Sequence, residues 1–266
     1  MKKTALSLSL VLIFFFGSHQ VRAQEYSFLP YEQMKLEAYY NLGPFWVHAG
    51  NVELTADTVT YEGQKCARLT AVGYSLKKWN FIFSLEDHYS SIVRLNGFLP
   101  LTYEKKTMEN GFWIHNVYHF DWHKDSLNVF TQSIRDAAKD TTYSLQNKLY
   151  DVLTACYYLR TLNTKNYHPY DTIPIPIITD GKFYSFKIIY LGKKSLKRKK
   201  DRVECDVFTI DNMTSTFFSG KEPLKVYVSD DPRKFIIYVE ANIVVGSLKV
   251  YQEGYIKMRP VKSSMQ

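Results

Sequence analysis

The chain has 266 residues, of which 45% are hydrophobic and 16% aromatic, and its 34 lysines and arginines outnumber 26 aspartates and glutamates. This length lies within the size range of one large β domain. No repeat, low-complexity segment or flexible linker divides it. No stretch beyond residue 23 is apolar over enough residues to cross a bilayer as a helix, so we expect no membrane-spanning segment.

Residues 1–23 have the organisation of a secretory signal peptide. Two lysines form the charged start, residues 5–16 form an apolar run, and Val21-Arg22-Ala23 supplies the cleavage positions. No cysteine lies near the cleavage site, which argues against a lipid anchor. We therefore predict a cleaved leader followed by a single exported β-rich domain over residues 24–266, located in the periplasm or outside a bacterial cell.

Much of the excess positive charge is concentrated in residues 193–202, which contain five lysines and two arginines. A basic run of this kind can bind nucleic acid or anionic lipid head groups. A solvated hairpin tip between two strands is the simpler interpretation. Because export separates the protein from nucleic acid, we predict a hairpin tip and no nucleic-acid partner, and leave a contact with lipid head groups open.

Three cysteines allow one disulfide in an oxidising compartment and leave one thiol over. Cys66 and Cys205 each lie in a strand-like stretch and form the candidate pair, although spacing in the sequence does not fix the distance between them. Cys156 is expected on the apolar face of a helix, where a thiol behaves as a small hydrophobe. No CxxC spacing occurs, so zinc-ribbon and redox motifs have no support.

Alternating apolar and polar residues predict strands along most of the chain. Asn110-Gly111 is the strongest hairpin signal, because a type I′ turn needs positive φ at both positions. Residues 76–85 fit either a short helix or a buried strand, and Pro169, Pro174 and Pro176 predict an extended connector. The predicted strands are residues 34–40, 45–60, 66–74, 87–95, 101–108, 112–122, 183–191, 202–210, 224–229, 235–241 and 244–258, with one or two shorter ones before residue 150.

One amphipathic helix is predicted, over residues 151–162. Asp151 can cap its first turn, and Val152, Cys156 and Leu159 repeat at helical spacing on one face. About a dozen strands joined by short turns, with this single helix, predict a mainly β fold. We expect a curled, barrel-like antiparallel meander with the helix packed against it, because curling removes exposed strand edges.

His115, His119 and His123 invite interpretation as metal ligands. In a strand, four residues separate neighbouring side chains by about 13 Å, whereas ligands of one zinc ion lie about 2 Å from it. The spacing excludes one shared ion along a straight strand, so we predict no metal and no cofactor. No Walker loop, HExxH, EF-hand loop or GxSxG elbow occurs either.

The carboxylates that remain as candidates are Asp87, Asp230 and Asp231. Two acids within about 5–10 Å of each other could hydrolyse a glycoside. Residues 230–233, Asp-Asp-Pro-Arg, are more simply a turn, since Asp favours the first position and Pro presets φ at the next. Asp87 lies beside His88, but no serine or cysteine elbow completes a triad.

Several short segments together span most of the chain: the early strand followed by Gly43 and Ala49-Gly50, residues 83–91, Leu99-Pro100, residues 151–155, residues 158–160 and residues 228–233. In their order these segments resemble the bacterial exported family described as domain of unknown function 3108. The resemblance implies an exported β-rich fold and implies no reaction. A curled sheet closed by a helix is also similar, in fold alone, to the periplasmic lipoprotein carriers.

The polar residues within that resemblance, Asp87, Arg160, Asp230 and Asp231, form our predicted polar cluster, with an ion pair between Arg160 and an aspartate as its expected role. The 21 tyrosines and 17 phenylalanines suit a cavity wall and equally suit cross-strand packing. We expect a non-catalytic protein that binds an apolar or amphipathic envelope ligand, such as a lipid, or an envelope protein. The alternatives are an envelope glycan hydrolase, which needs Asp87 beside Asp230 or Asp231, and an assembly or scaffold protein.

Overall fold

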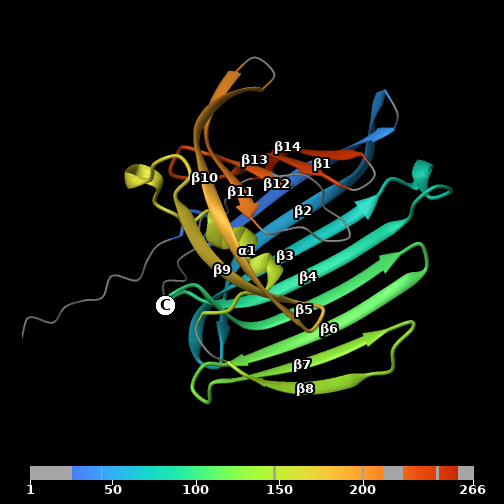
Figure 1. Cartoon of the computed structure of the whole chain (residues 1–266), viewed down its shortest axis with the longest axis vertical. Coiled ribbons are helices and arrows are strands. Elements are labelled where there is room, and N and C mark those ends of the chain that lie inside the picture. The colour runs from blue at the N-terminus through green and yellow to red at the C-terminus, as the bar shows by residue number, and fades with distance from the viewer. Residues whose placement is uncertain are drawn as a thin grey trace, which may run out of the picture.

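A computed structural model describes residues 26–42, 44–145, 148–198, 201–211, 224–243 and 246–256. The predicted signal peptide lies outside these residues. Fourteen strands of the described chain form one antiparallel sheet that curls like a barrel and does not close (Figure 1). The predicted mainly β, barrel-like meander is therefore confirmed.

Eight consecutive strands run from the centre of the sheet to one edge, each paired with its neighbour in the chain. Successive side chains point to opposite faces, so every second residue faces the concave side. The strands are β1 (Tyr31–Leu42), β2 (Phe45–Tyr61), β3 (Gln64–Ser75), β4 (Leu85–Arg94), β5 (Leu99–Glu109), β6 (Phe112–Asp121), β7 (Ser126–Ser133) and β8 (Lys139–Ser144).

The other six strands run from the opposite edge back to the centre, where β14 pairs with β1. They are β9 (Thr172–Thr179), β10 (Lys182–Arg198), β11 (Asp201–Asp211), β12 (Leu224–Ser229), β13 (Ile236–Asn242) and β14 (Ser247–Ile256). β8 and β9 follow one another in the chain yet lie at opposite edges. The segment between them therefore crosses the concave side, and it carries the helix (Figure 1).

The helix α1 (Val152–Leu159) contacts β3, β4 and β9 from inside the curl. As predicted, Asp151 caps it and accepts a hydrogen bond from the Thr154 N–H at 2.8 Å. The predicted apolar stripe is wrong at Cys156, which is exposed, because the buried face is turned toward Leu153 and Tyr157. No helix of the described residues is long and apolar enough to cross a membrane.

Three hairpins share one turn geometry. Asn110-Gly111, between β5 and β6, has φ values of 49° and 81°, which confirms the predicted turn with positive φ at both positions. Glu62-Gly63 joins β2 to β3, and Asp180-Gly181 joins β9 to β10, with the same pattern of φ. The last of these turns carries a carboxylate to the concave side of the sheet.

The structure decides two stretches of the chain, residues 76–85, for which helix and strand were both open, and the proline-rich segment predicted to be a connector. Residues 76–84 form a loop that contains the 3₁₀ helix η1 (Lys77–Trp79). Pro174 and Pro176 lie within strand β9 and not in a connector, because β9 is an edge strand and tolerates residues without an N–H. A second 3₁₀ helix, η2 (Thr164–Asn166), precedes it.

The basic run lies in the two long strands of the β10–β11 hairpin, in which Arg198 and Asp201 are cross-strand neighbours. Lys193, Lys194 and Lys197 are exposed along it. This confirms the predicted hairpin, while its tip, residues 199–200, lies outside the described part of the chain.

Aromatic rings fill much of the space between the sheet and α1. Tyr103 and Tyr118 lie on neighbouring strands with ring centroids 5.2 Å apart, and Phe28 meets Tyr157 of α1 edge-to-face at 5.2 Å. All four are at most 1% exposed, so this part of the aromatic content serves core packing.

Cys66 and Cys205 are both buried free thiols, so the predicted disulfide is wrong. Cys66 lies on β3 and Cys205 on β11, and five strands separate these two in the sheet. Both cysteines are in strands as expected, but which strands become neighbours is a long-range property that local patterning does not contain.

Candidate functional site

Two rows of cross-strand neighbours carry mainly polar side chains on the concave face, near the end of the sheet where β4 begins. On β5 and β6 these residues lie two or four positions from the core residues Tyr103 and Tyr118, so they point to the same face. On β4 and β7 they are the cross-strand partners of those positions and share that face as well. The outer row is Asp87, Thr107, Ile114 and Ser133. The inner row is Tyr89, Lys105, Asn116 and Thr131. We call these two rows, together with Asp180, the mouth site.

Asp180 reaches the rows from the opposite edge of the sheet. Its Oδ1 accepts hydrogen bonds from Lys105 Nζ and from Asn116 Nδ2, each at 2.8 Å. The following amide, Gly181 N–H, donates to the Tyr118 hydroxyl at 3.0 Å. These contacts hold the β9–β10 hairpin against β5 and β6 on the concave face. The two edge strands, β8 and β9, are not paired with each other through their backbones.

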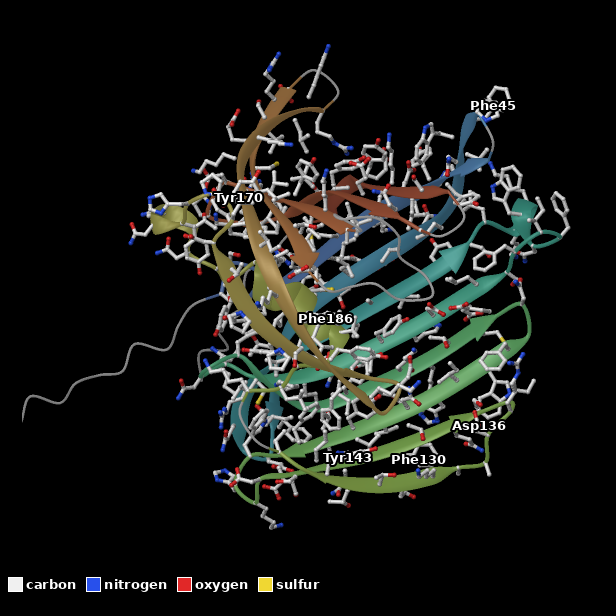
Figure 2. The ribbon with its side chains drawn as sticks, viewed as in Figure 1. Phe45, Phe130, Asp136, Tyr143, Tyr170 and Phe186 are labelled. Atoms are coloured by element: carbon white, nitrogen blue, oxygen red, sulfur yellow. The ribbon has the colours of Figure 1, made fainter. Side chains whose placement is uncertain are left out.

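Aromatic packing supports the same hairpin from β8. The ring of Tyr143 meets that of Phe183 edge-to-face, with centroids 5.0 Å apart. Figure 2 shows Tyr143 beside the strands that carry the hairpin. The two edges of the sheet therefore meet through rings as well as through the Asp180 contacts.

A cavity of about 310 Å³ lies at the mouth site and extends to the turn between β7 and β8. Phe112, Ile114 and Ala137 give it apolar surface. Asp136, which lies on that turn (Figure 2), is one of its lining residues. The polar residues that line it are Asn116, Thr131, Gln132, Ser133, Asp136, Lys139 and Asp180. The cavity therefore offers both apolar and polar contacts.

Asp87 is 8% exposed and only half-satisfied. Its Oδ2 accepts a hydrogen bond from the Tyr89 hydroxyl at 3.2 Å, while its Oδ1 has no hydrogen-bond partner among the described residues. Burial raises the pKa of Asp87 to about 6, and repulsion from Glu109 adds to the rise, against smaller opposing effects of Tyr89, Lys105 and the backbone of Met108. This carboxyl therefore changes its protonation in mildly acidic solution.

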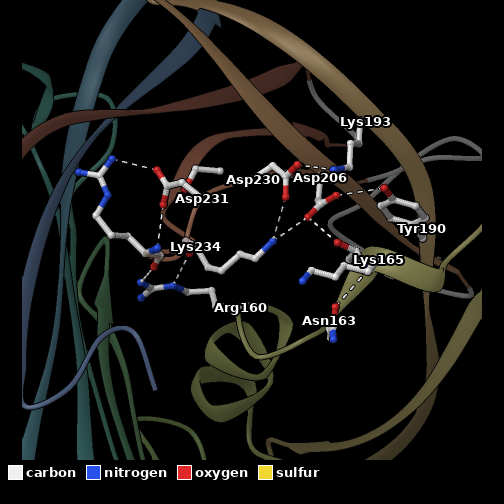
Figure 3. A network of polar contacts seen from close by, with 12 residues as sticks. Arg160, Asn163, Lys165, Tyr190, Lys193, Asp206, Asp230, Asp231 and Lys234 are labelled. Carbon is white, nitrogen blue, oxygen red and sulfur yellow. Dashed lines mark hydrogen bonds and ion pairs between the residues drawn. The ribbon is translucent and has the colours of Figure 1, made fainter. Parts of the chain in front are cut away.

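A second polar network surrounds Arg160, directly after α1 (Figure 3). Arg160 Nη1 and Nη2 donate to the two carboxylate oxygens of Glu32 at 2.6 and 2.8 Å, and both side chains are 0% exposed. Its Nε donates to the carbonyl of Lys234 at 2.7 Å and its Nη2 to that of Arg233 at 3.2 Å. The predicted ion pair with an aspartate is wrong, because Glu32 supplies the carboxylate.

Asp206 is the other buried acid of this network, 1% exposed. Its Oδ2 accepts hydrogen bonds from Thr164 Oγ1 at 2.7 Å and from Lys234 Nζ at 3.0 Å, and its Oδ1 accepts one from the Tyr190 hydroxyl at 3.0 Å (Figure 3). Lys234 therefore connects the two halves of the network, since its carbonyl binds Arg160 and its ammonium binds Asp206.

Asp230 and Asp231 form the turn between β12 and β13, as predicted. Asp230 pairs with Lys193 and, at 3.4 Å, with Lys234. The hydrogen bond from Lys193 lowers the pKa of Asp230. Asp231 accepts hydrogen bonds from the Arg233 N–H at 2.7 Å and from Arg233 Nη2 at 2.9 Å. Each of the two carboxylates is therefore paired with a cation, Asp230 with Lys193 and Lys234, and Asp231 with Arg233.

The four predicted site residues thus fall in two places. Arg160, Asp230 and Asp231 meet around residues 233–234, whereas Asp87 lies in the mouth site on β4. Five strands separate β4 from β12 in the sheet. No hydrogen bond or ion pair of the described residues joins Asp87 to either of the other aspartates.

Sequence reasoning missed Glu32, Lys105 and Asn116. Each lies two residues from a fully buried side chain of its own strand, as Glu32 does from Met34 and Lys105 from Tyr103. Two positions along a strand return to the same face. A charged or amide residue at an inward position is therefore the signal that could have found them.

A second cavity, of about 490 Å³, lies at the other end of the strands, between the β2–β3 and β6–β7 turns. Arg94, His119 and His123 are among its lining residues. His115 lies elsewhere and contacts Glu104 at 2.9 Å. Within the described ranges, no group of three or more His, Cys, Asp or Glu side chains could hold a metal ion.

The fold and the site together define the class of this protein: it has an open, barrel-like antiparallel sheet, a helix inside the curl, and the mouth site on its concave face. The family described as "Protein of unknown function (DUF3108)" matches residues 35–253, and the chain belongs to this family. No curated protein matches the chain.

Among solved structures, the chain is similar to a β-barrel-like protein of the domain of unknown function DUF1849 from Brucella abortus. The TM-score is 0.53 at 5% sequence identity, over 87% of this chain and 99% of that chain. At this identity the likeness concerns the fold alone, so a function must be argued from the site.

Proposed function

We propose that the protein is an exported, non-catalytic binding protein whose mouth site holds an amphipathic ligand. Two observations carry this proposal: a cavity that is part apolar and part polar, and the nine-tenths buried Asp87, whose Oδ1 has no hydrogen-bond partner among the described residues. Asp87 does not line the cavity but lies in the same cross-strand row as its lining residues Ile114 and Ser133. A buried polar atom without a partner costs stability, so its retention indicates a group reserved for something outside the chain.

The lining of the cavity indicates the chemistry of the ligand. Phe112 and Ile114 suit a hydrocarbon portion, while Asn116, Thr131 and Lys139 suit a polar head. A cavity of about 310 Å³ is at the small end for a complete ligand, so the rest of the molecule extends past the mouth. Export, inferred from residues 1–23, makes an envelope amphiphile the natural candidate.

The hydrolase alternative needs two carboxylates on opposite sides of one substrate bond. Asp87 has neither Asp230 nor Asp231 among its contacts, and each of those two already has a cation. Their arrangement supports a turn and not a catalytic pair. We therefore do not assign a reaction to the mouth site.

Native mass spectrometry of protein expressed from the full chain and purified without detergent tests this function, followed by solvent extraction and lipid analysis. We expect a co-purifying amphiphile, and binding of a fluorescent fatty acid to the emptied protein. Ala137→Trp fills the cavity from its exposed side without removing a hydrogen bond of the mouth site, so it should abolish both.

Ala138→Trp is the matched control, because Ala138 is an equally exposed neighbour that does not line the cavity. It should bind as the wild type does. A wild-type protein that carries no amphiphile and does not bind the fluorescent fatty acid would rule out the proposed function.

A further inference from the structure

The loop between β3 and β4 exposes three consecutive large apolar side chains. Phe81 is 81%, Ile82 57% and Phe83 40% exposed. Figure 1 shows this segment projecting past the end of β3. Single exposed apolar residues are ordinary on a protein surface, whereas a contiguous group marks an interaction surface.

Hydrogen bonds hold this loop in a defined shape. Trp79 Nε1 donates to the carbonyl of His48 at 2.7 Å, and the Leu76 N–H donates to the carbonyl of Ala49 at 2.8 Å. The N–H groups of Ile82 and Phe83 both donate to the Trp79 carbonyl, at 2.8 and 2.9 Å. The apolar side chains are therefore presented to solvent by a fixed backbone.

The start of β2 extends the same surface. The loop is hydrogen-bonded to His48 and Ala49, and the first two residues of the same strand, Phe45 and Trp46, are 70% and 43% exposed. Figure 2 shows Phe45 at this end of the molecule. We define the aromatic rim as Phe45, Trp46, Phe81, Ile82 and Phe83.

Cations accompany the rim. Lys77 and Lys78 precede the apolar triplet, and residues 76–84 contain no acidic side chain. Lys249 Nζ lies 4.2 Å from the ring centroid of Trp46, which brings a third ammonium to the rim. Exposed aromatic and aliphatic residues with lysines beside them are the composition of surfaces that bind anionic bilayers.

We propose that the aromatic rim docks the protein on a membrane surface that contains anionic lipid. Phe81, Ile82 and Phe83 enter the boundary between head groups and acyl chains, and the three lysines contact lipid phosphates. The inference does not rest on the proposed ligand, since it uses no residue of the mouth site. Docking brings the mouth site close to the bilayer, because β4 begins directly after the loop.

Vesicle flotation tests this proposal, with vesicles of phosphatidylcholine alone and of phosphatidylcholine with about a third phosphatidylglycerol. We expect the wild type to float with the anionic vesicles. The triple change Phe81→Ser, Ile82→Ser and Phe83→Ser should weaken binding more than about tenfold. Lys77→Ala with Lys78→Ala should weaken it about fivefold per lysine on anionic vesicles only.

Tyr170→Ser is the matched control, since Tyr170 is 73% exposed and Figure 2 shows it on the opposite side of the molecule from Phe45. It should float as the wild type does. The proposal is overturned if the wild type stays with neither vesicle, or if the triple variant floats equally well. Thermal unfolding of each variant, expected to match the wild type, separates lost docking from lost folding.

Discussion

The Arg160 network and Asp87 of the mouth site are both buried, but they differ in how many of their polar atoms have hydrogen-bond partners. Around Arg160, the guanidinium and Glu32 are both 0% exposed, and two further backbone carbonyls accept from Arg160. In the mouth site, Asp87 is 8% exposed but keeps one oxygen without a hydrogen bond. The charges around Arg160 are fully paired within the protein, whereas one carboxyl oxygen of Asp87 has no hydrogen-bond partner among the described residues.

The difference separates a structural role from a binding role. A buried charge that loses its partner is costly, so removing one member of a fully paired network should destabilise the fold. The Arg160 network ties α1 to β1 and to the β12–β13 turn. The Oδ1 of Asp87 has no hydrogen-bond partner among the described residues, and Asp87 lies in the same cross-strand row as the cavity residues Ile114 and Ser133. The following variants test this comparison.

Removing the matched charge should have the largest effect. Arg160→Ala leaves Glu32 buried without its cation, and we expect a loss of about 3–5 kcal/mol in the free energy of unfolding. Urea denaturation measures it. Arg135→Ala is the control, because Arg135 is exposed and stacks on Phe112 at 4.9 Å, so it should cost less than about 1 kcal/mol.

The double variant Glu32→Gln with Arg160→Met sharpens this test. It removes both charges together and should be less destabilised than Arg160→Ala alone. A cost of Arg160→Ala no larger than that of Arg135→Ala would show that the buried ion pair does not hold the fold.

Asp87→Asn should act in the opposite direction. Because the pKa of Asp87 is raised to about 6 from 3.8, the folded state holds this proton more tightly than the unfolded chain does. Its contribution to stability is fully present below about pH 4 and is lost as the pH rises through about 6. The amide variant has no charge to bury, so at pH 8 it should be more stable than the wild type by up to about 3 kcal/mol.

Chemical denaturation at pH 4 and at pH 8 measures this difference. We expect the gain at pH 8 and little change at pH 4. Asp140→Asn, at an exposed position of β8, should change stability at neither pH. A gain of equal size at both pH values would contradict the assignment, since the effect would not follow the charge of Asp87.

Asp180→Ala should have the smallest effect of the three. Its ion pair with Lys105 is half-exposed on the aspartate side, 48% against 12% on the lysine side, so we expect a cost of about 1 kcal/mol. The β9–β10 hairpin should open more often, which amide hydrogen exchange of those strands detects. Unchanged exchange in β9 and β10 would mean that the hairpin is held by its rings and not by Asp180.

Much of the secondary structure could be predicted because its causes are local. Alternation placed the strands near Tyr31–Leu42 and Phe112–Asp121, Asp151 marked the start of α1, and Asn110-Gly111 marked a turn. These signals depend on the strand period, the cap and positive φ, which involve residues close together in the chain. The mainly β class followed from them.

Other features were decided only by the tertiary structure. Arg160 and Glu32 are 128 residues apart in the chain and meet because β1 pairs with β14, next to the strand that follows residues 233–234. Cys66 and Cys205 stay apart because five strands separate theirs. Asp180 reaches Lys105 only because β8 and β9 lie at opposite edges of a sheet that curls. A strand pattern determines which face is buried, but the order of strands and the closure of the curl depend on contacts between distant residues, which no local period encodes.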